Sequence, residues 1–259
     1  GSRISPEEGR PRLMFLHPLP RSARPELLDA ESPPPERLSG NLRDISRVNR
    51  FLGGTSTLLR ALARAARADF PNPRTPFSVL DVGTGAGDIP RAIAKWAEAN
   101  GRTARIWAVD LRPDILRFAT ETGPRPITLG FARADARALP VRPAGVDYVL
   151  ASLVLHHFDR DAAVRLLREF RHCARRAVII NDLRRGRAPY AAAFLLTHLT
   201  TRNRMTRYDA PLPALRTFVS NELDAMAREA GFAAWRLSRS FPCRLSLVAR
   251  PAGATPGNK

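Results

Sequence analysis

The sequence is poor in cysteine and in large aromatic residues, with two Cys, three Trp and three Tyr among 259 residues. Cys173 and Cys243 are too few for a disulfide scaffold or for a structural zinc site with paired Cys and His ligands. The longest apolar run, Tyr190 to Leu196, is far shorter than the roughly 20 residues that a membrane-spanning helix needs. We therefore expect a globular chain without a membrane span, in a reducing, cytoplasmic environment.

Lysine is also scarce: Lys95 and Lys259 are the two lysines among 42 basic residues. With 24 acidic residues, the formal net charge is +18, and such a balance raises the question of a nucleic-acid partner. The arginines are spread along the whole chain, however, and few aromatic residues stand between them to stack on bases. We interpret the charge as a solvated basic surface, and we favour a partner other than nucleic acid.

Proline and hydrophobic periodicity divide the chain into segments. Six prolines between residues 18 and 35 predict an extended N-terminal arm over residues 1–34. Apolar residues then recur every three or four positions, which predicts two helices in a cap over residues 35–75. We expect one α/β domain over residues 76–250, and a tail over residues 251–259.

Short β-branched runs alternate with amphipathic stretches in this domain, which is typical of βαβ units with right-handed crossovers. We predict an α/β fold with a Rossmann-like, doubly wound sheet of seven strands, mostly parallel, with the N-terminal helices packed against it. Residues 184–217 exceed an ordinary connection, and we expect a helical lid there. The predicted strands cover residues 77–82, 105–110, 127–132, 146–152, 177–181, 233–238 and 244–249.

The strongest functional signal is SVLDVGTGAGDIP at residues 78–90, where an apolar strand runs into a glycine-rich turn before a helix. Gly83, Gly85 and Gly87 allow a ligand to approach the backbone closely. The dinucleotide fingerprint requires a third glycine at the position of Asp88, and a carboxylate there would repel a pyrophosphate. The turn therefore disfavours a dinucleotide.

Three further motifs follow at the ends of predicted strands. IWAVDL ends at Asp110, where an acidic side chain can accept hydrogen bonds from ribose hydroxyls. ARADARALP carries Asp135, whose carboxylate can accept from an adenine amino group. VDYVLASLVLHHF leaves its strand at Ser152 and presents His156 and His157.

In this order and spacing, the motifs resemble those of the class I S-adenosylmethionine-dependent methyltransferases over roughly residues 77–183. The pattern is similar to the small-molecule enzymes related to quinone biosynthesis. NDLRRGRAPY and TRNRMTRYDAPLP also resemble a bacterial branch associated with polyketide or phenolic biosynthesis. The resemblance implies that S-adenosylmethionine is the cofactor. It implies cofactor-binding roles for Asp81, Gly83, Thr84, Gly85, Gly87, Asp88, Asp110, Leu111, Asp135, Ala136, Ser152 and Leu153.

The implied reaction is O- or C-methylation of a phenolic or polyketide-derived small molecule. A phenol has a pKa of about 10, so a base within hydrogen-bond reach would raise its reactive phenolate fraction at neutral pH. His156 is our first candidate for this base and His157 the second. Candidate acceptor-binding residues are Asn181 and Asp182 after the fifth strand, and His198 and Tyr208 in the lid.

Two other functions compete with this interpretation. A methyltransferase of nucleic acid bases would use an Asn/Asp-Pro-Pro-aromatic sequence after the fourth strand, where this chain has ASLVLHH. A noncatalytic cofactor-binding protein is the other alternative, and the intact set of acidic and glycine residues argues against it. No metal-ligand cluster stands out beyond Asn181 and Asp182, so we expect metal-independent transfer. The acceptor, the methylated atom and the oligomeric state stay open.

Overall fold

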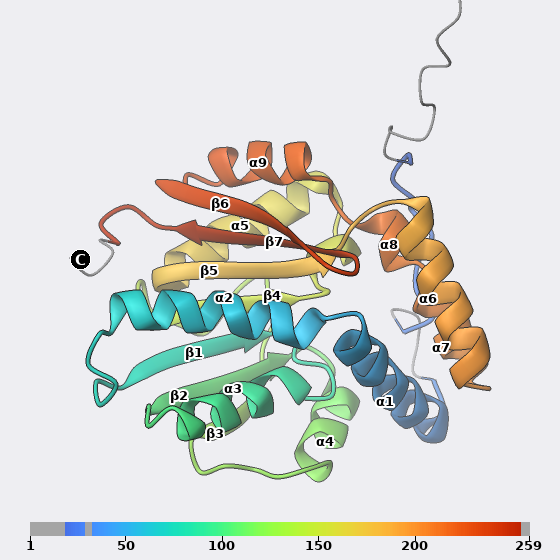
Figure 1. Cartoon of the computed structure of the whole chain (residues 1–259), viewed down its shortest axis with the longest axis horizontal. Helices are drawn as coiled ribbons and strands as arrows, with labels where there is room; N and C mark the ends of the chain where they lie inside the picture. The colour runs from blue at the N-terminus through green and yellow to red at the C-terminus, as the bar shows by residue number, and fades with distance from the viewer. Residues whose placement is uncertain (1–18, 29–32, 255–259) are drawn as a thin grey trace, which may run out of the picture.

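Figure 1 shows a computed structural model of the chain, in which residues 19–28 and 33–254 are described. Seven strands in these ranges form one sheet with the order β3-β2-β1-β4-β5-β7-β6. The pairs are parallel except for those of β7, which runs antiparallel to β5 and β6. The predicted fold class is therefore confirmed. The strands are β1 (Phe77–Val82), β2 (Ala104–Asp110), β3 (Leu129–Arg133), β4 (Val146–Ser152), β5 (Ala174–Leu183), β6 (Ala234–Ser240) and β7 (Arg244–Arg250).

Helices cover both faces of the sheet. The apolar sides of α2 and α3 pack on one face, and those of α5 and α9 on the other. None of the helices in the described ranges has both the length and the apolar character that crossing a bilayer requires. The helices are α1 (Pro35–Phe51), α2 (Gly54–Asp69), α3 (Asp88–Ala99), α4 (Pro113–Glu121), α5 (Arg160–Cys173), α6 (Arg187–Thr200), α7 (Arg204–Asp209), α8 (Pro213–Arg216), α9 (Ser220–Glu229) and the 3₁₀ helix η1 (Leu155–His157).

The central strand β4 is buried along its whole length, as expected for a parallel strand covered on both faces. Its Tyr148 is the one large polar side chain in that strand, and its hydroxyl donates to Asp69 at 2.7 Å. Asp69 also accepts from Arg250 at 3.0 Å. Each polar group in this part of the core therefore has a partner, which avoids the cost of burying it alone.

The sheet contains a switch point between β1 and β4. β1 pairs with β2 on one side and with β4 on the other, so the chain winds outward from β1 and β4 in opposite directions. In such a sheet, a crevice forms beyond the carboxyl ends of the two strands. Figure 1 shows α1, α6, α7 and α8 gathered at this end of the sheet.

The strands β1 and β4 have the predicted bounds, whereas β5 is longer than predicted, because it pairs with β4 from Ala174 and with β7 through Leu183. The expected lid segment, residues 184–217, contains three short helices, α6, α7 and α8. Of the predicted arm and tail, residues 1–18, 29–32 and 255–259 lie outside the described residues.

Candidate functional site

The glycine turn joins β1 to α3 at the crevice. Gly83, Gly85 and Gly87 all have positive φ, at 67°, 54° and 72°, a conformation that side chains with a Cβ rarely adopt. A Cβ on Gly83 would lie 2.6 Å from a methyl of Val154, whereas one on Gly85 would meet nothing within 4 Å. The turn therefore leaves open space over Gly85 for a ligand.

Asp110 ends β2 directly beside this turn. Its carboxylate accepts hydrogen bonds from the backbone N–H of Gly85 and of Arg112, both at 3.2 Å. Burial raises the pKa of Asp110 above its ordinary value, although these N–H groups partly counter that effect. The predicted ribose-binding carboxylate is thus held in a fixed position at the cavity wall.

Two more carboxylates lie under the same turn. Asp81 is 1% exposed, and burial raises its pKa to about 7. Its Oδ2 atom has no hydrogen-bond partner among the described residues. Burial also raises the pKa of Asp88, which accepts from Ser46 at 3.3 Å and from Thr55 at 3.4 Å. Three desolvated carboxylates around one turn favour a ligand that carries positive charge.

Asp135 occupies the rim beyond β3. Its carboxylate is bound by the guanidinium of Arg137, with an Oδ2–Nη2 distance of 2.6 Å, and this contact holds the pKa of Asp135 below its ordinary value. Asp135 is therefore ionised at neutral pH and remains able to accept a further hydrogen bond.

A cavity of about 590 Å³ connects these groups. Its lining comes from the glycine turn, the carboxyl ends of the central strands, the inner side of α1, residues 26–28 and residues 209–213. The predicted site residues that line it are Gly83, Thr84, Gly85, Asp88, Asp110, Leu111, Asp135, Ala136, Ser152, Leu153, His156 and His157. Those outside its lining are Asp81, Gly87, Asn181, Asp182, His198 and Tyr208.

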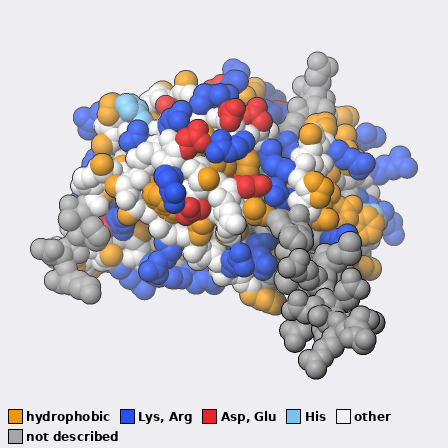
Figure 2. Space-filling view, turned by 90° about the horizontal axis from the view of Figure 1, so that it is seen from above, with side chains coloured by type: hydrophobic (Ala, Val, Ile, Leu, Met, Phe, Trp, Pro, Cys, Tyr) orange, Lys and Arg blue, Asp and Glu red, His pale blue; other side chains and the backbone are white. Residues whose placement is uncertain are grey.

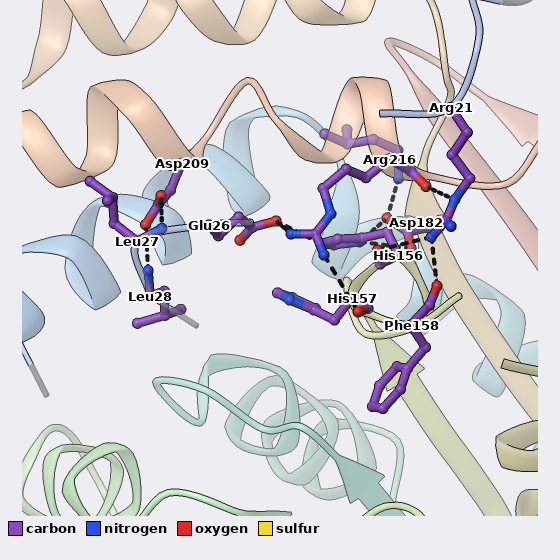
Figure 3. A network of polar contacts seen from close by, with 11 residues as sticks. Arg21, Glu26, Leu27, Leu28, His156, His157, Phe158, Asp182, Asp209 and Arg216 are labelled. Atoms are coloured by element: carbon purple, nitrogen blue, oxygen red, sulfur yellow. Dashed lines mark hydrogen bonds and ion pairs between the residues drawn. The ribbon is translucent and has the colours of Figure 1, made fainter. Parts of the chain in front are cut away.

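His156 lies between two carboxylates in the cavity wall (Figure 3). Its Nδ1 is 3.0 Å from both carboxylate oxygens of Asp182, and its Nε2 is 3.2 Å from Oε1 of Glu26. Burial alone would lower the pKa of His156, but the two carboxylates outweigh it and raise the pKa to about 10. The ring is therefore an imidazolium at neutral pH, without the lone pair that a base needs.

Glu26 belongs to residues 19–28, which we call the strap. At one end of the strap, Arg21 donates to the carbonyl oxygens of Arg216 at 2.6 Å and of Phe158 at 2.6 Å. At the other end, the backbone N–H groups of residues 27 and 28 donate to the carboxylate of Asp209 at 2.7 and 3.1 Å. Figure 3 shows these contacts on both sides of Glu26. The strap is thus fastened across the cavity.

Glu26, His156 and His157 each place one atom that could bind a metal ion within 4.8 Å of the others. The imidazolium of His156, together with Arg216 at 3.5 Å from Glu26, already balances the negative charge of Glu26 and Asp182. Charge balance here needs no metal ion, and metal-independent transfer stays our prediction.

The predicted acceptor-binding residues have other surroundings in the structure. Asn181 is fully buried and donates to Ser152 Oγ at 3.0 Å, and Asp182 binds His156. His198 contacts the Phe194 carbonyl oxygen of its own helix at 2.8 Å, and Tyr208 is exposed. These side chains do not line the cavity, and their acceptor-binding roles stay predictions.

Sequence reasoning missed several polar residues of the cavity wall, among them Glu26, Asp209 and Arg244. Arg244 begins β7, is 1% exposed, and donates to the Leu52 carbonyl oxygen at 2.9 Å and to Asn49 at 2.8 Å. Burial lowers its pKa to about 10, which leaves it charged at neutral pH. An arginine at the start of a mostly apolar strand was the one available signal for a buried charge.

Replacing His156 should expose the stabilising effect of its charge. The folded pKa of about 10 lies above the ordinary 6.5, so the imidazolium contributes fully below pH 6.5 and progressively less as pH rises to 10. We expect His156→Gln to lower the free energy of unfolding by roughly 3–5 kcal/mol at pH 6. The difference in the free energy of unfolding between the variant and wild type should shrink toward pH 10.

Urea unfolding between pH 6 and pH 10 measures this difference. His172→Gln is the matched control, because His172 is exposed on α5. A deficit that does not change with pH would contradict a charged role for His156.

The sequence and the fold were compared with known proteins. Residues 79–177 match a family described as a methyltransferase domain. A search of curated proteins gave no match. Among solved structures, a SAM-dependent methyltransferase from Aquifex aeolicus is similar, with 16% identity and a TM-score of 0.58 over 84% of this chain and 98% of that chain.

Two other solved structures share the fold. Magnesium protoporphyrin IX methyltransferase from Synechocystis PCC 6803, with bound SAH, has 17% identity and a TM-score of 0.53, covering 77% of this chain and 84% of its own. The CurJ carbon methyltransferase has 15% identity and a TM-score of 0.63, and the match covers 85% of this chain and 62% of the CurJ chain. The matched domain contains the glycine turn, Asp110 and Asp135. Residues 79–177 are thus a methyltransferase domain, and the chain shares its fold with solved SAM-dependent methyltransferases.

Proposed function

We propose that this methyltransferase acts on a small-molecule acceptor, a phenolic or polyketide-derived compound that is methylated on oxygen or carbon. One observation carries the proposal: a single cavity is lined both by the cofactor motifs and by apolar residues beneath the strap. Its volume of about 590 Å³ falls within the range of roughly 300–1,000 Å³ of small-molecule sites. The carbon methyltransferase with the same fold supports C-methylation as one of the two outcomes.

The cofactor half of the cavity suits S-adenosylmethionine, which supplies a methyl group on a positively charged sulfonium. We infer that Asp81 and Asp88 attract its positive charge from beneath the turn. Asp110 would accept from the ribose hydroxyls and Asp135 from the adenine amino group. The remaining predicted positions that line the cavity, Gly83, Thr84, Gly85, Leu111, Ala136, Ser152 and Leu153, would shape this half of it, and Gly87 would support the turn from outside the lining.

The acceptor half is mainly apolar. Leu42 and Ile45 of α1 face it from one side, and Ala210 and Pro213 from another. A water-poor site of this kind suits methyl transfer, which is a displacement that needs positioning more than charge transfer from the protein. The strap covers this half, which favours a compact acceptor over a nucleic-acid strand.

The two histidines are assigned different roles in this proposal. His156 carries a proton and positions the strap through Glu26. His157 is half-buried, lines the cavity, and its ring centroid lies 4.3 Å from that of His156. We infer that His157 is the base that removes the proton of a phenolic or enolic acceptor.

Loss of the Asp110 carboxylate should weaken cofactor binding. We expect Asp110→Asn to reduce the affinity for SAH by about tenfold or more, since hydrogen bonds to a charged group contribute roughly 1.5–3 kcal/mol. Calorimetric titration measures the effect. Asp161→Asn, on the exposed side of α5, is the control. Equal affinities in the two variants would remove Asp110 from the cofactor site.

Cofactor affinity should depend on pH through Asp81. Its pKa is about 7, so the attractive charge is present above pH 7 and is lost below it. We expect the association constant for S-adenosylmethionine to fall by up to about tenfold per pH unit below pH 7. Asp81→Asn should bind weakly with little dependence on pH. The same pH slope in both proteins would assign the titration to another group.

Replacing His157 should slow methylation of weakly acidic acceptors. A general base contributes about 10²- to 10⁴-fold, so we expect His157→Gln to lower kcat/KM by that order on unsubstituted phenols at pH 7. The defect should be small on nitrophenols, which ionise without help. Steady-state assays with phenols of graded acidity test this. An equal defect across the series would indicate a structural role.

A further inference from the structure

Helix α6 has its larger apolar side chains on the outside. The residues that it buries against the protein are small: Pro189, Ala193 and Thr197. Phe194, Leu195 and Leu199, by contrast, are 43%, 59% and 75% exposed. A helix that packs on a globular domain normally has the reverse arrangement. The outer face of α6 is therefore built for an apolar environment.

The neighbouring end of α1 extends this apolar surface. Phe51 is 74% exposed and shares a shallow groove with Leu196 and Thr200 of α6. We call Phe51, Phe194, Leu195 and Leu199 the α6 patch. In Figure 2, hydrophobic side chains gather beside Lys and Arg side chains at the end of the molecule where α6 lies in Figure 1.

The segment around the patch is strongly basic. Residues 183–208 contain six arginines and no acidic residue. Arg184 before α6, Arg187 at its first position, and Arg202 and Arg204 after it are exposed. None of these four forms an ion pair with another described residue. The patch thus has positive charge at both of its ends.

Apolar side chains flanked by arginines are complementary to an anionic lipid surface, where the former enter the acyl boundary and the latter bind phosphate headgroups. A second copy of this chain would bring two such basic segments together, and like charges would repel. A nucleic acid would satisfy the arginines but leave Leu195 and Leu199 in contact with water or charge. We propose that α6 docks this methyltransferase on membranes rich in anionic phospholipid.

Figure 1 shows α6 at the end of the sheet where α1, α7 and α8 gather. Helices α7 and α8 follow α6 in the chain, and Asp209 at the end of α7, Ala210 and Pro213 at the start of α8 line the cavity. Docking through α6 would therefore hold the cavity close to the bilayer surface.

Flotation of the full chain with lipid vesicles tests the proposal. We expect binding to phosphatidylcholine vesicles that contain about one third phosphatidylglycerol, weak binding to pure phosphatidylcholine, and weaker binding at high salt. The double variant Leu195→Gln/Leu199→Gln should lose about tenfold or more in partitioning, because two apolar side chains no longer insert. Ile127→Gln, which changes a fully exposed isoleucine elsewhere, should bind like wild type.

Three results would overturn the proposal. Equal binding of wild type and the double variant would mean that charge alone causes adsorption. Absence of binding to the anionic vesicles would remove the lipid surface as partner. A wild-type dimer in light scattering that the double variant lacks would assign the patch to a second copy. Equal SAH titrations and thermal midpoints establish that the variants are folded.

Discussion

A buried imidazolium links three separate parts of the chain at the wall of the cavity. His156 follows β4, Asp182 belongs to β5, and Glu26 belongs to the strap. A group that is 1% exposed keeps its charge only where opposite charges and hydrogen bonds replace the lost water. The contacts that keep His156 charged are therefore the same contacts that position the strap over the sheet. The acceptor half of the cavity depends on this arrangement.

The cofactor half could be predicted from the sequence because its determinants are local. The turn from residue 83 to residue 87 lies between a strand and a helix with clear periodicity, and Asp110 ends the next strand. In a doubly wound sheet, the ends of these strands meet at one edge whatever the rest of the chain does. The strap and its contacts over the cavity have no such local signal in the sequence. Glu26 and the Asp209 contact of Leu27 join residues more than 100 positions apart, and proline-rich sequence gives no period that predicts them.

The acceptor-binding predictions show where periodicity stops being informative. Asn181 and Asp182 were expected just past the fifth strand, but antiparallel pairing with β7 continues β5 through Leu183, and both side chains are buried. The prediction for His198 depended on which face of α6 points toward the protein. That helix is apolar on nearly all sides, so its sequence does not indicate which face points inward. Packing of the small residues Ala193 and Thr197 against the protein decides the matter.

The strap is fastened at both ends, by Arg21 near its start and by Asp209 on the amides of residues 27 and 28. Contacts that hold the strap over the cavity also restrict the path by which a product leaves. Each catalytic cycle consequently includes an excursion in which some of these hydrogen bonds are exchanged for bonds to water, and then re-formed. On the proposed function, release of product, rather than bond making at the acceptor, becomes the natural step to limit turnover beneath a strap held in this manner.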